Sequence, residues 1–252
     1  MKQITKQLKQ DIHSFDSIEE RLNYLKDKYK GETAYIVTCG PSLSTHNIDK
    51  LKSKLKDKLV ICLKQAQNLL EEETDFHLMS TYNLSPYSWG KDSITFWQLA
   101  KSYAEGQLQK VINLKAPIDL YIPVINPPFI TRQQTTQSTE NFDNFYMMET
   151  HTEVMWGCGM IYETGIPLAL LLGCTEIVTI GWDLGDPSKQ HTHFDDDKVK
   201  RDCYPMEGEI AETLKSTIAL ETWFKQKGID FEILSDQSFI NPNFKRITIN
   251  DI

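Results

Sequence analysis

Short apolar runs separated by polar loops and helical patterns make up most of this chain. The runs with strand character lie at 34–38, 59–63, 76–79, 110–114, 119–124, 176–180 and 229–234. The first two are continuous rather than alternating, which is typical of parallel strands covered on both faces. The pattern predicts an α/β fold: a single Rossmann-like domain with a mostly parallel central sheet flanked by helices.

Helical patterns fall between these runs. We expect helices at 47–56, 67–73, 94–105 and 206–227, and one that opens at Gly157 and ends at Gly173. Pro167 lies inside the last of these and predicts a kink or a fresh helical start. Residues 1–31 are expected to form an N-terminal amphipathic helix that packs across the sheet or serves an oligomer contact, which leaves 32–252 as the Rossmann-like domain.

A long polar segment interrupts the alternation. Residues 130–144 are rich in Thr, Gln, Ser and Asn and offer little to bury. A segment of this length is typical either of a lid or of plain disorder. We therefore place a lid-like or mobile loop at about 130–150.

Composition narrows the class of protein. The chain has 252 residues and a formal net charge of −8, which argues against nucleic acid as a partner. Its N-terminus has no apolar signal core and no run is long enough to span a bilayer, so we expect a cytoplasmic protein with at most peripheral membrane contact. The five cysteines form no CxxC pair and are expected to be buried free thiols. A homo-oligomer is compatible with all of this.

The stretch 34–44 carries the first candidate for chemistry. Its strand breaks abruptly into Cys39-Gly40-Pro41-Ser42, and a Gly-Pro pair cannot continue a ladder. Small residues at the carboxyl end of a strand let the backbone approach a ligand, and the nearby N–H groups and hydroxyls suit a phosphate. A simple tight turn would give the same sequence.

Polar residues follow other strands as well. Gln65 comes after the second run, Asn83 after the third and Asp183 after the run at 176–180. In a parallel sheet these positions converge on one edge. Gln65 and Asn83 have donors and acceptors suited to sugar hydroxyls or a base edge, although loop capping would also explain them.

The most polar stretch is 183–202. It contains His191 and His193, followed by three aspartates at 195–197. A histidine that is neutral near pH 7 is a natural general base for a sugar hydroxyl. Two histidines with carboxylates would equally bind a divalent metal, and a solvated acidic loop would look the same. The residues alone leave these three alternatives open.

Several blocks occur in a characteristic order: IVTCGPSLS, ICLKQAQ, STYN, GCGMIYETGIPLALLLGCTEIVTIGWDLG, HTH and ALETWFKQKGIDFEILSDQS. This order resembles bacterial sialyltransferases of glycosyltransferase family 42. It is also similar to motility accessory factors and to archaeal 6-hydroxymethylpterin pyrophosphokinases. The blocks are short, and together they cover most of the chain.

The resemblance implies a donor site. Gly40, Pro41 and Ser42 match the family's turn that holds a CMP-sugar, but Cys39 replaces its asparagine. Further donor-binding positions fall on Gln65, Asn83, Cys158 and Gly159. Cys158 stands where the family has a serine, whereas Gly159 matches the family's glycine.

The resemblance also implies catalytic residues. Asp183 matches a Gly-x-Asp motif, and His193 falls in the segment that carries the family's catalytic histidine, with His191 as the reserve. No cofactor or metal is implied. The first hypothesis is thus a metal-independent, inverting glycosyltransferase that moves a sugar, such as a nonulosonate or another 2-keto sugar, from a CMP-activated donor to a glycan acceptor.

Two other classes of function stay open. A Mg²⁺-dependent pyrophosphokinase of the 6-hydroxymethylpterin type would use ATP, with Asp183 and the aspartates at 195–197 as metal ligands. A motility-accessory-factor-like glycosyltransferase is kept with it as an alternative to the first hypothesis. A non-catalytic nucleotide-binding or assembly protein would use the histidine-rich loop only as solvated surface.

Overall fold

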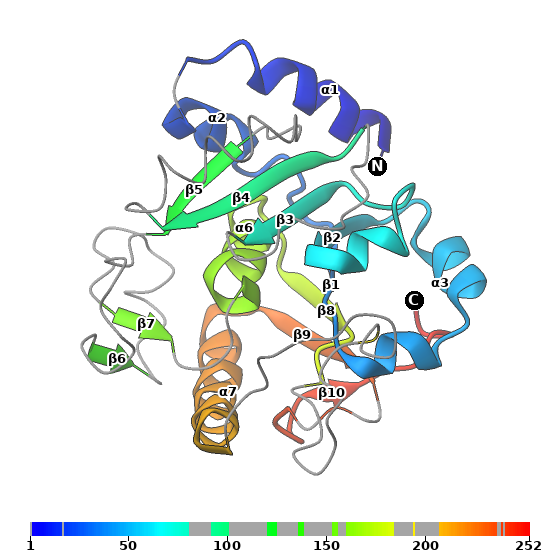
Figure 1. The fold of residues 1–252 in the computed structure, drawn as a ribbon, viewed down its shortest axis with the longest axis vertical. Coiled ribbons are helices and arrows are strands. Elements are labelled where there is room, and N and C mark those ends of the chain that lie inside the picture. The colour runs from blue at the N-terminus through cyan, green and yellow to red at the C-terminus, as the bar shows by residue number, and fades with distance from the viewer. Residues whose placement is uncertain are drawn as a thin grey trace.

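A computed structural model describes residues 2–16, 18–80, 92–100, 120–124, 136–138, 153–155, 160–183, 194, 207–235, 238 and 240–252. These residues form a parallel sheet with helices on both faces (Figure 1). The sheet confirms the predicted α/β class.

Eight strands make up the main sheet, in the order β10-β9-β8-β1-β2-β3-β4-β5. Every pair of neighbours in it is parallel. The strands are β1 (Thr33–Val37), β2 (Leu59–Leu63), β3 (Phe76–Ser80), β4 (Ile94–Ala100), β5 (Leu120–Val124), β8 (Glu176–Ile180), β9 (Asp230–Leu234) and β10 (Lys245–Arg246). Two short strands, β6 (Thr136–Ser138) and β7 (Glu153–Met155), pair separately.

The order of the strands creates a switch point. From β1 the chain proceeds to β2, β3, β4 and β5 on one side, and it then returns to place β8 and β9 on the other side of β1. The connections that leave β1 and β8 therefore diverge at their carboxyl ends. In open α/β sheets, such a divergence opens the crevice in which ligands bind.

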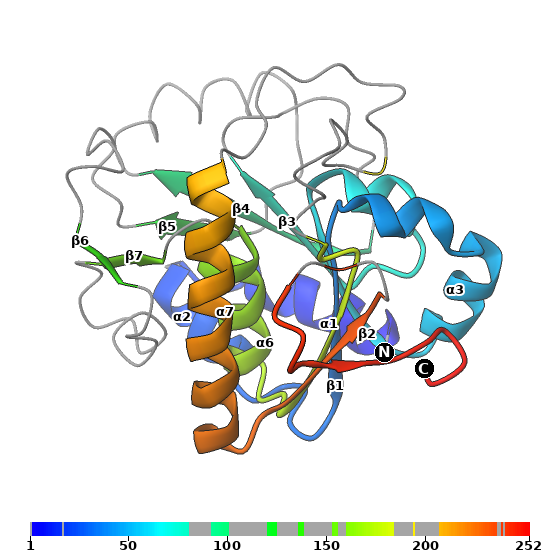
Figure 2. The same ribbon diagram turned by 90° about the horizontal axis from the view of Figure 1, so that it is seen from below.

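Each face of the sheet has its own apolar core. On one face, Ile36 and Ile61 of the sheet pack in one cluster with residues from α1 (Lys2–Ile12), α2 (Ile18–Leu25), α6 (Ile166–Leu171) and α7 (Glu207–Lys227). On the other face, Val37 and Cys62 pack with Leu51 of α3 (Ile48–Leu55). Figure 2 shows α6 and α7 on the opposite side of β1 from α3.

A proline marks the change of helix type before β8. The π-helical turn η3 (Ile161–Gly165) leads directly into α6, which begins at Ile166 and has Pro167 in its first turn. Proline is tolerated there because the first N–H groups of a helix have no partner within the helix. Of the two predicted outcomes, a kink or a fresh helical start, the structure shows a fresh start, at Ile166 directly before Pro167.

Residues 94–105 were expected to be helical, and this is wrong for the part that the structure describes. Ile94–Ala100 form β4, which pairs with β3 through Phe76 and Ile94. Ile94 and Phe96 are buried, and β-branched and aromatic residues suit a pleated surface. Spacing alone could not separate this short apolar run from a helix, and pairing with a neighbouring strand decided it.

Two segments that were expected to be single helices differ from expectation. Residues 1–31 contain two helices, α1 and α2, where we expected one. A 3₁₀ turn, η2 (Lys64–Asn68), stands where a helix at 67–73 was expected. Within the predicted lid at about 130–150, the described residues form the strand β6. The expected strand at 110–114 lies outside the described residues.

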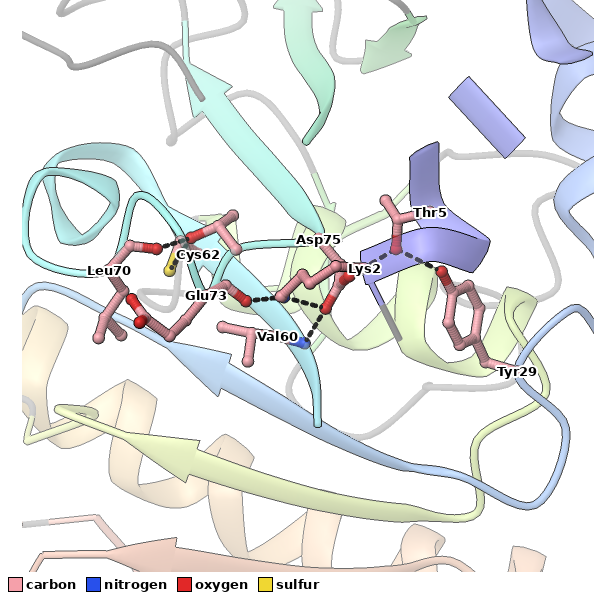
Figure 3. Close-up of polar contacts among 9 residues, drawn as sticks. Lys2, Thr5, Tyr29, Val60, Cys62, Leu70, Glu73 and Asp75 are labelled. Carbon is pink, nitrogen blue, oxygen red and sulfur yellow. Dashed lines mark hydrogen bonds and ion pairs between the residues drawn. The ribbon is translucent and has the colours of Figure 1, made fainter. Parts of the chain in front are cut away.

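A buried carboxylate fixes α1 to the sheet (Figure 3). Asp75 precedes β3 and accepts hydrogen bonds from the backbone N–H of Val60 at 2.9 Å, the Lys2 ammonium at 2.6 Å and the Thr5 hydroxyl. The Thr5 hydroxyl also lies 2.7 Å from the Tyr29 hydroxyl. This network lies at the amino end of β3, at the opposite edge of the sheet from the loops that follow the strands.

Candidate functional site

Asp183 joins three strand ends at the switch point. It lies three residues after β8 and its side chain is buried. Its carboxylate accepts hydrogen bonds from the backbone N–H of Ser42 at 2.6 Å and from the Ser42 hydroxyl at 2.7 Å. The Ser235 hydroxyl, directly after β9, donates to it at 3.1 Å. The loops after β1, β8 and β9 are thus tied to one carboxylate.

Gly40 lies against the loop that follows β8. Its N–H donates to the carbonyl of Gly181 at 2.8 Å, and the buried Thr38 hydroxyl donates to the same carbonyl. A Cβ at Gly40 would lie 2.1 Å from that carbonyl oxygen and 2.5 Å from Asp183 Oδ2. The approach of the β8 loop is therefore enough to require glycine here, whatever ligand binds.

Cys39 links this loop to β2 and to the segment after Asp183. Its thiol donates to the carbonyl of Leu63 at 3.2 Å. Its own carbonyl accepts a hydrogen bond from the N–H of Phe194 at 2.8 Å, and the Phe194 ring packs against the core on the α3 side. In the sequence, Phe194 directly follows His193.

The turn after β2 holds a strained residue. Lys64 has φ 49°, a left-handed conformation that costs a residue with a Cβ about 1–2 kcal/mol. His77 Nε2 lies 2.9 Å from the Lys64 carbonyl oxygen. Burial lowers the pKa of His77 to about 4, so at neutral pH the ring is neutral and its Nε2–H donates to that carbonyl. Gln65, next in the chain, is buried.

The structure brings together only part of the predicted site. Gly40, Pro41, Ser42 and Asp183 meet at the switch point, and Gln65 lies in the turn after the adjacent strand β2. The remaining predicted residues lie outside the described residues: Asn83, Cys158, Gly159, His191 and His193.

The structure also adds residues that the sequence did not single out. Thr38 and His77 hold the loops after β1 and β2, but each lies within or next to an apolar run and has no recognisable motif. The contact between Ser42 and Asp183 had no signature either, because it joins residues 141 positions apart.

The described part of the chain contains neither a candidate metal site nor an exposed thiol. There, no group of three His, Cys, Asp or Glu side chains is arranged to hold a metal ion. Cys39, Cys62 and Cys174 are free and buried, as predicted for these three. Burial raises the pKa of Cys62 and of Cys174 to about 12, so both thiols stay protonated. Among the described helices none is long and apolar enough to cross a membrane.

Comparison with known proteins supports the fold. No protein-family model and no curated protein matches the chain significantly. A solved structure, that of the MAf glycosyltransferase from Magnetospirillum magneticum AMB-1, is similar to it with a TM-score of 0.51 and 14% identity. The match covers 93% of this chain but only 38% of that protein. At this identity the likeness establishes a shared Rossmann-like fold.

Proposed function

We propose that this chain is a glycosyltransferase that binds a CMP-activated sugar at the switch point and transfers the sugar to a glycan acceptor with inversion. The observation that carries the proposal is the meeting of loops at the switch point, where Ser42 is hydrogen-bonded to Asp183 and Gly40 to Gly181 at the carboxyl end of β1. The fold shared with a MAf glycosyltransferase supports the reaction class. A MAf-like enzyme would belong to that same class.

In this proposal the donor contacts the loops after β1, β2 and β3. Gln65 and Asn83 bind sugar hydroxyls or the base, and the segment with Cys158 and Gly159 binds the donor from the start of the helix before β8. The N–H and the hydroxyl of Ser42 are both directed at Asp183. The donor therefore contacts the β1 loop through the backbone shape of the loop and through polar groups other than these two. Asp183 acts as a positioning residue.

His193 is the proposed general base. Its sequence neighbour Phe194 is hydrogen-bonded to Cys39, beside Gly40 of the donor loop. His193 removes the proton from the acceptor hydroxyl, and the oxygen attacks the anomeric carbon. CMP leaves from the opposite face with the electron pair of the broken bond, which inverts the configuration. His191 is the reserve for this role, and no metal takes part in any of these steps.

A nucleotide panel tests the proposal directly. Melting temperatures are measured with CMP, CDP, UDP, GDP and ATP, each with EDTA and with Mg²⁺, because a ligand that binds only the folded state raises the melting temperature. We expect CMP to stabilise the protein in EDTA. A shift seen only with ATP and Mg²⁺ would support the pyrophosphokinase instead, and no shift with any nucleotide would support an assembly protein.

The role of His193 is tested separately. His193→Ala is expected to abolish sugar transfer and to leave the CMP-induced shift intact, because a general base acts in the chemical step. The same change at the exposed His13, directly after α1, should alter neither. Full transfer activity in His193→Ala would move the role to His191 or refute base catalysis by this loop.

A further inference from the structure

Among the described residues, the buried carboxamide of Gln67 has no hydrogen-bond partner. It lies in η2, the 3₁₀ turn that follows β2 and packs against β2 and β3. Its side chain is fully buried, and neither Oε1 nor Nε2 has a hydrogen-bond partner in the part of the chain that the structure describes. Buried polar atoms are nearly always hydrogen-bonded, so an amide with both ends open requires an explanation.

The backbone carbonyls around Gln67 already accept hydrogen bonds from other groups. The Gln67 carbonyl accepts a hydrogen bond from the N–H of Leu70 at 3.2 Å. The Lys64 carbonyl accepts from His77, and the Leu63 carbonyl accepts from the Cys39 thiol. The same turn holds Lys64 in its left-handed conformation. Strained backbone that is held by such surroundings is frequent at ligand sites.

A carboxamide has both an acceptor oxygen and an NH₂ donor, which limits the chemical groups that can satisfy both of its ends. A phosphate or a carboxylate would use only the N–H groups of Gln67, and a metal cation would use only its oxygen. Both ends are satisfied together by a group with an acceptor and a donor side by side. The Watson–Crick edge of cytosine, with N3 and the N4 amino group, has this pattern.

We propose that Gln67 is a specificity-determining residue that binds the polar edge of the nucleotide base. The inference rests on the proposed function, because it assigns a role within the same donor site. The Gln67 oxygen accepts from the amino group of the base, and its N–H donates to the ring nitrogen. In the free protein the amide of Gln67 lacks hydrogen bonds to any described residue, and the bound nucleotide supplies the missing hydrogen bonds.

Gln67→Met tests this inference, because methionine keeps the length of the side chain and removes both polar atoms. We expect the melting temperature of the ligand-free protein to rise by about 2–4 °C, since an unpaired buried amide is removed. The affinity for CMP should fall about tenfold or more, equivalent to about 1.4 kcal/mol. The affinity for ribose 5-phosphate, which has no base, should stay unchanged. Gln10→Met, at an exposed position on α1, is the matched control and should change none of these.

The outcomes separate this inference from the proposed function. A lower melting temperature with unchanged CMP affinity would assign Gln67 to an internal water and overturn the inference. An equal loss of affinity for CMP and ribose 5-phosphate would also overturn it, because the contact would not be to the base. In both cases the wild-type protein still binds CMP. If the wild-type protein fails to bind CMP, the proposed function falls, and this inference falls with it.

Discussion

Asp183 accepts two hydrogen bonds from Ser42, one from its backbone N–H at 2.6 Å and one from its hydroxyl at 2.7 Å. The pairing joins the loop after β1 to the loop after β8, and the contact from Ser235 adds the end of β9. These hydrogen bonds fix the three loops relative to one another at the switch point in the ligand-free protein.

Asp183→Asn should loosen the contact between these loops. The amide replaces one acceptor oxygen with a donor, which then faces a donor group of Ser42 or Ser235. We expect a loss of about 2–3 kcal/mol in the free energy of unfolding and weaker binding of CMP. Urea denaturation and calorimetric titration measure the two effects. Asp57→Asn, at an exposed position before β2, is the control. Unchanged stability in Asp183→Asn would contradict the anchoring role.

Gly40→Ala should be far more damaging than an ordinary glycine substitution. The added Cβ would lie 2.1 Å from the Gly181 carbonyl oxygen, so the β1 and β8 loops must separate. We expect a loss of more than about 2 kcal/mol in the free energy of unfolding and no detectable CMP binding. Gly165→Ala is the matched control, because a Cβ there meets its nearest atom, on Ile36, at 3.4 Å and its φ is helical. Equal effects of the two changes would refute the steric argument.

His77 should make the protein sensitive to acid. Its pKa is about 4 in the fold against an ordinary value of 6.5. Between these pH values His77 is protonated in the unfolded chain and neutral in the folded protein. The contribution of neutral His77 to the free energy of unfolding is therefore complete above pH 6.5 and is lost as the pH falls toward 4. From pH 7.5 to 5 the loss amounts to about 2 kcal/mol in the free energy of unfolding.

His77→Gln tests this contribution, because glutamine does not titrate. The variant should lose about 2 kcal/mol less than the wild-type protein between pH 7.5 and 5, as measured by urea denaturation at both values. His13→Gln, at an exposed position after α1, should retain the wild-type decline. An unchanged acid response in His77→Gln would show that another group is responsible.

Asp75→Asn should weaken the docking of α1 without affecting ligand binding. The buried carboxylate of Asp75 accepts from Val60, Lys2 and Thr5, and an amide cannot replace all of these contacts (Figure 3). We expect a loss of about 2–4 kcal/mol in the free energy of unfolding and faster amide exchange in α1. CMP affinity should be retained, because Asp75 lies at the amino end of β3. A loss of CMP affinity in the folded variant would argue against this separation of the two edges.

Several elements could be predicted because local sequence and tertiary structure agree. The runs at 59–63 and 176–180 are apolar throughout and end in turn residues, and they became β2 and β8. The run that became β4 was misassigned because its local pattern fits two periods, and only its pairing with β3 decides between them. In α1, Leu8 and Ile12 are buried one helical turn apart, and this spacing is visible in the sequence.

The site was harder to predict than the fold. The sequence identified Gly40 and Ser42 from their position after a strand. It predicted that the backbone at Gly40 approaches a ligand and that the N–H and hydroxyl groups of this loop bind one. In the structure, Gly181 and Asp183 occupy that space. Nothing in a local pattern reveals such a pairing between distant loops. The orphaned amide of Gln67 had no sequence signature at all, since it is defined only by what surrounds it.

The position of β1 between β2 and β8 has a consequence for how the protein is made. As the chain leaves the ribosome, β1 to β5 can pair in order, because each is close in sequence to the next. One side of β1 then stays an open edge until β8 has been synthesised, since Thr33 pairs with Glu176. An exposed apolar edge is prone to aggregation during that interval. The loops at the switch point are thus brought together late, and a chain interrupted before β8 would lack both the Ser42–Asp183 contact and the strand that covers the edge of β1.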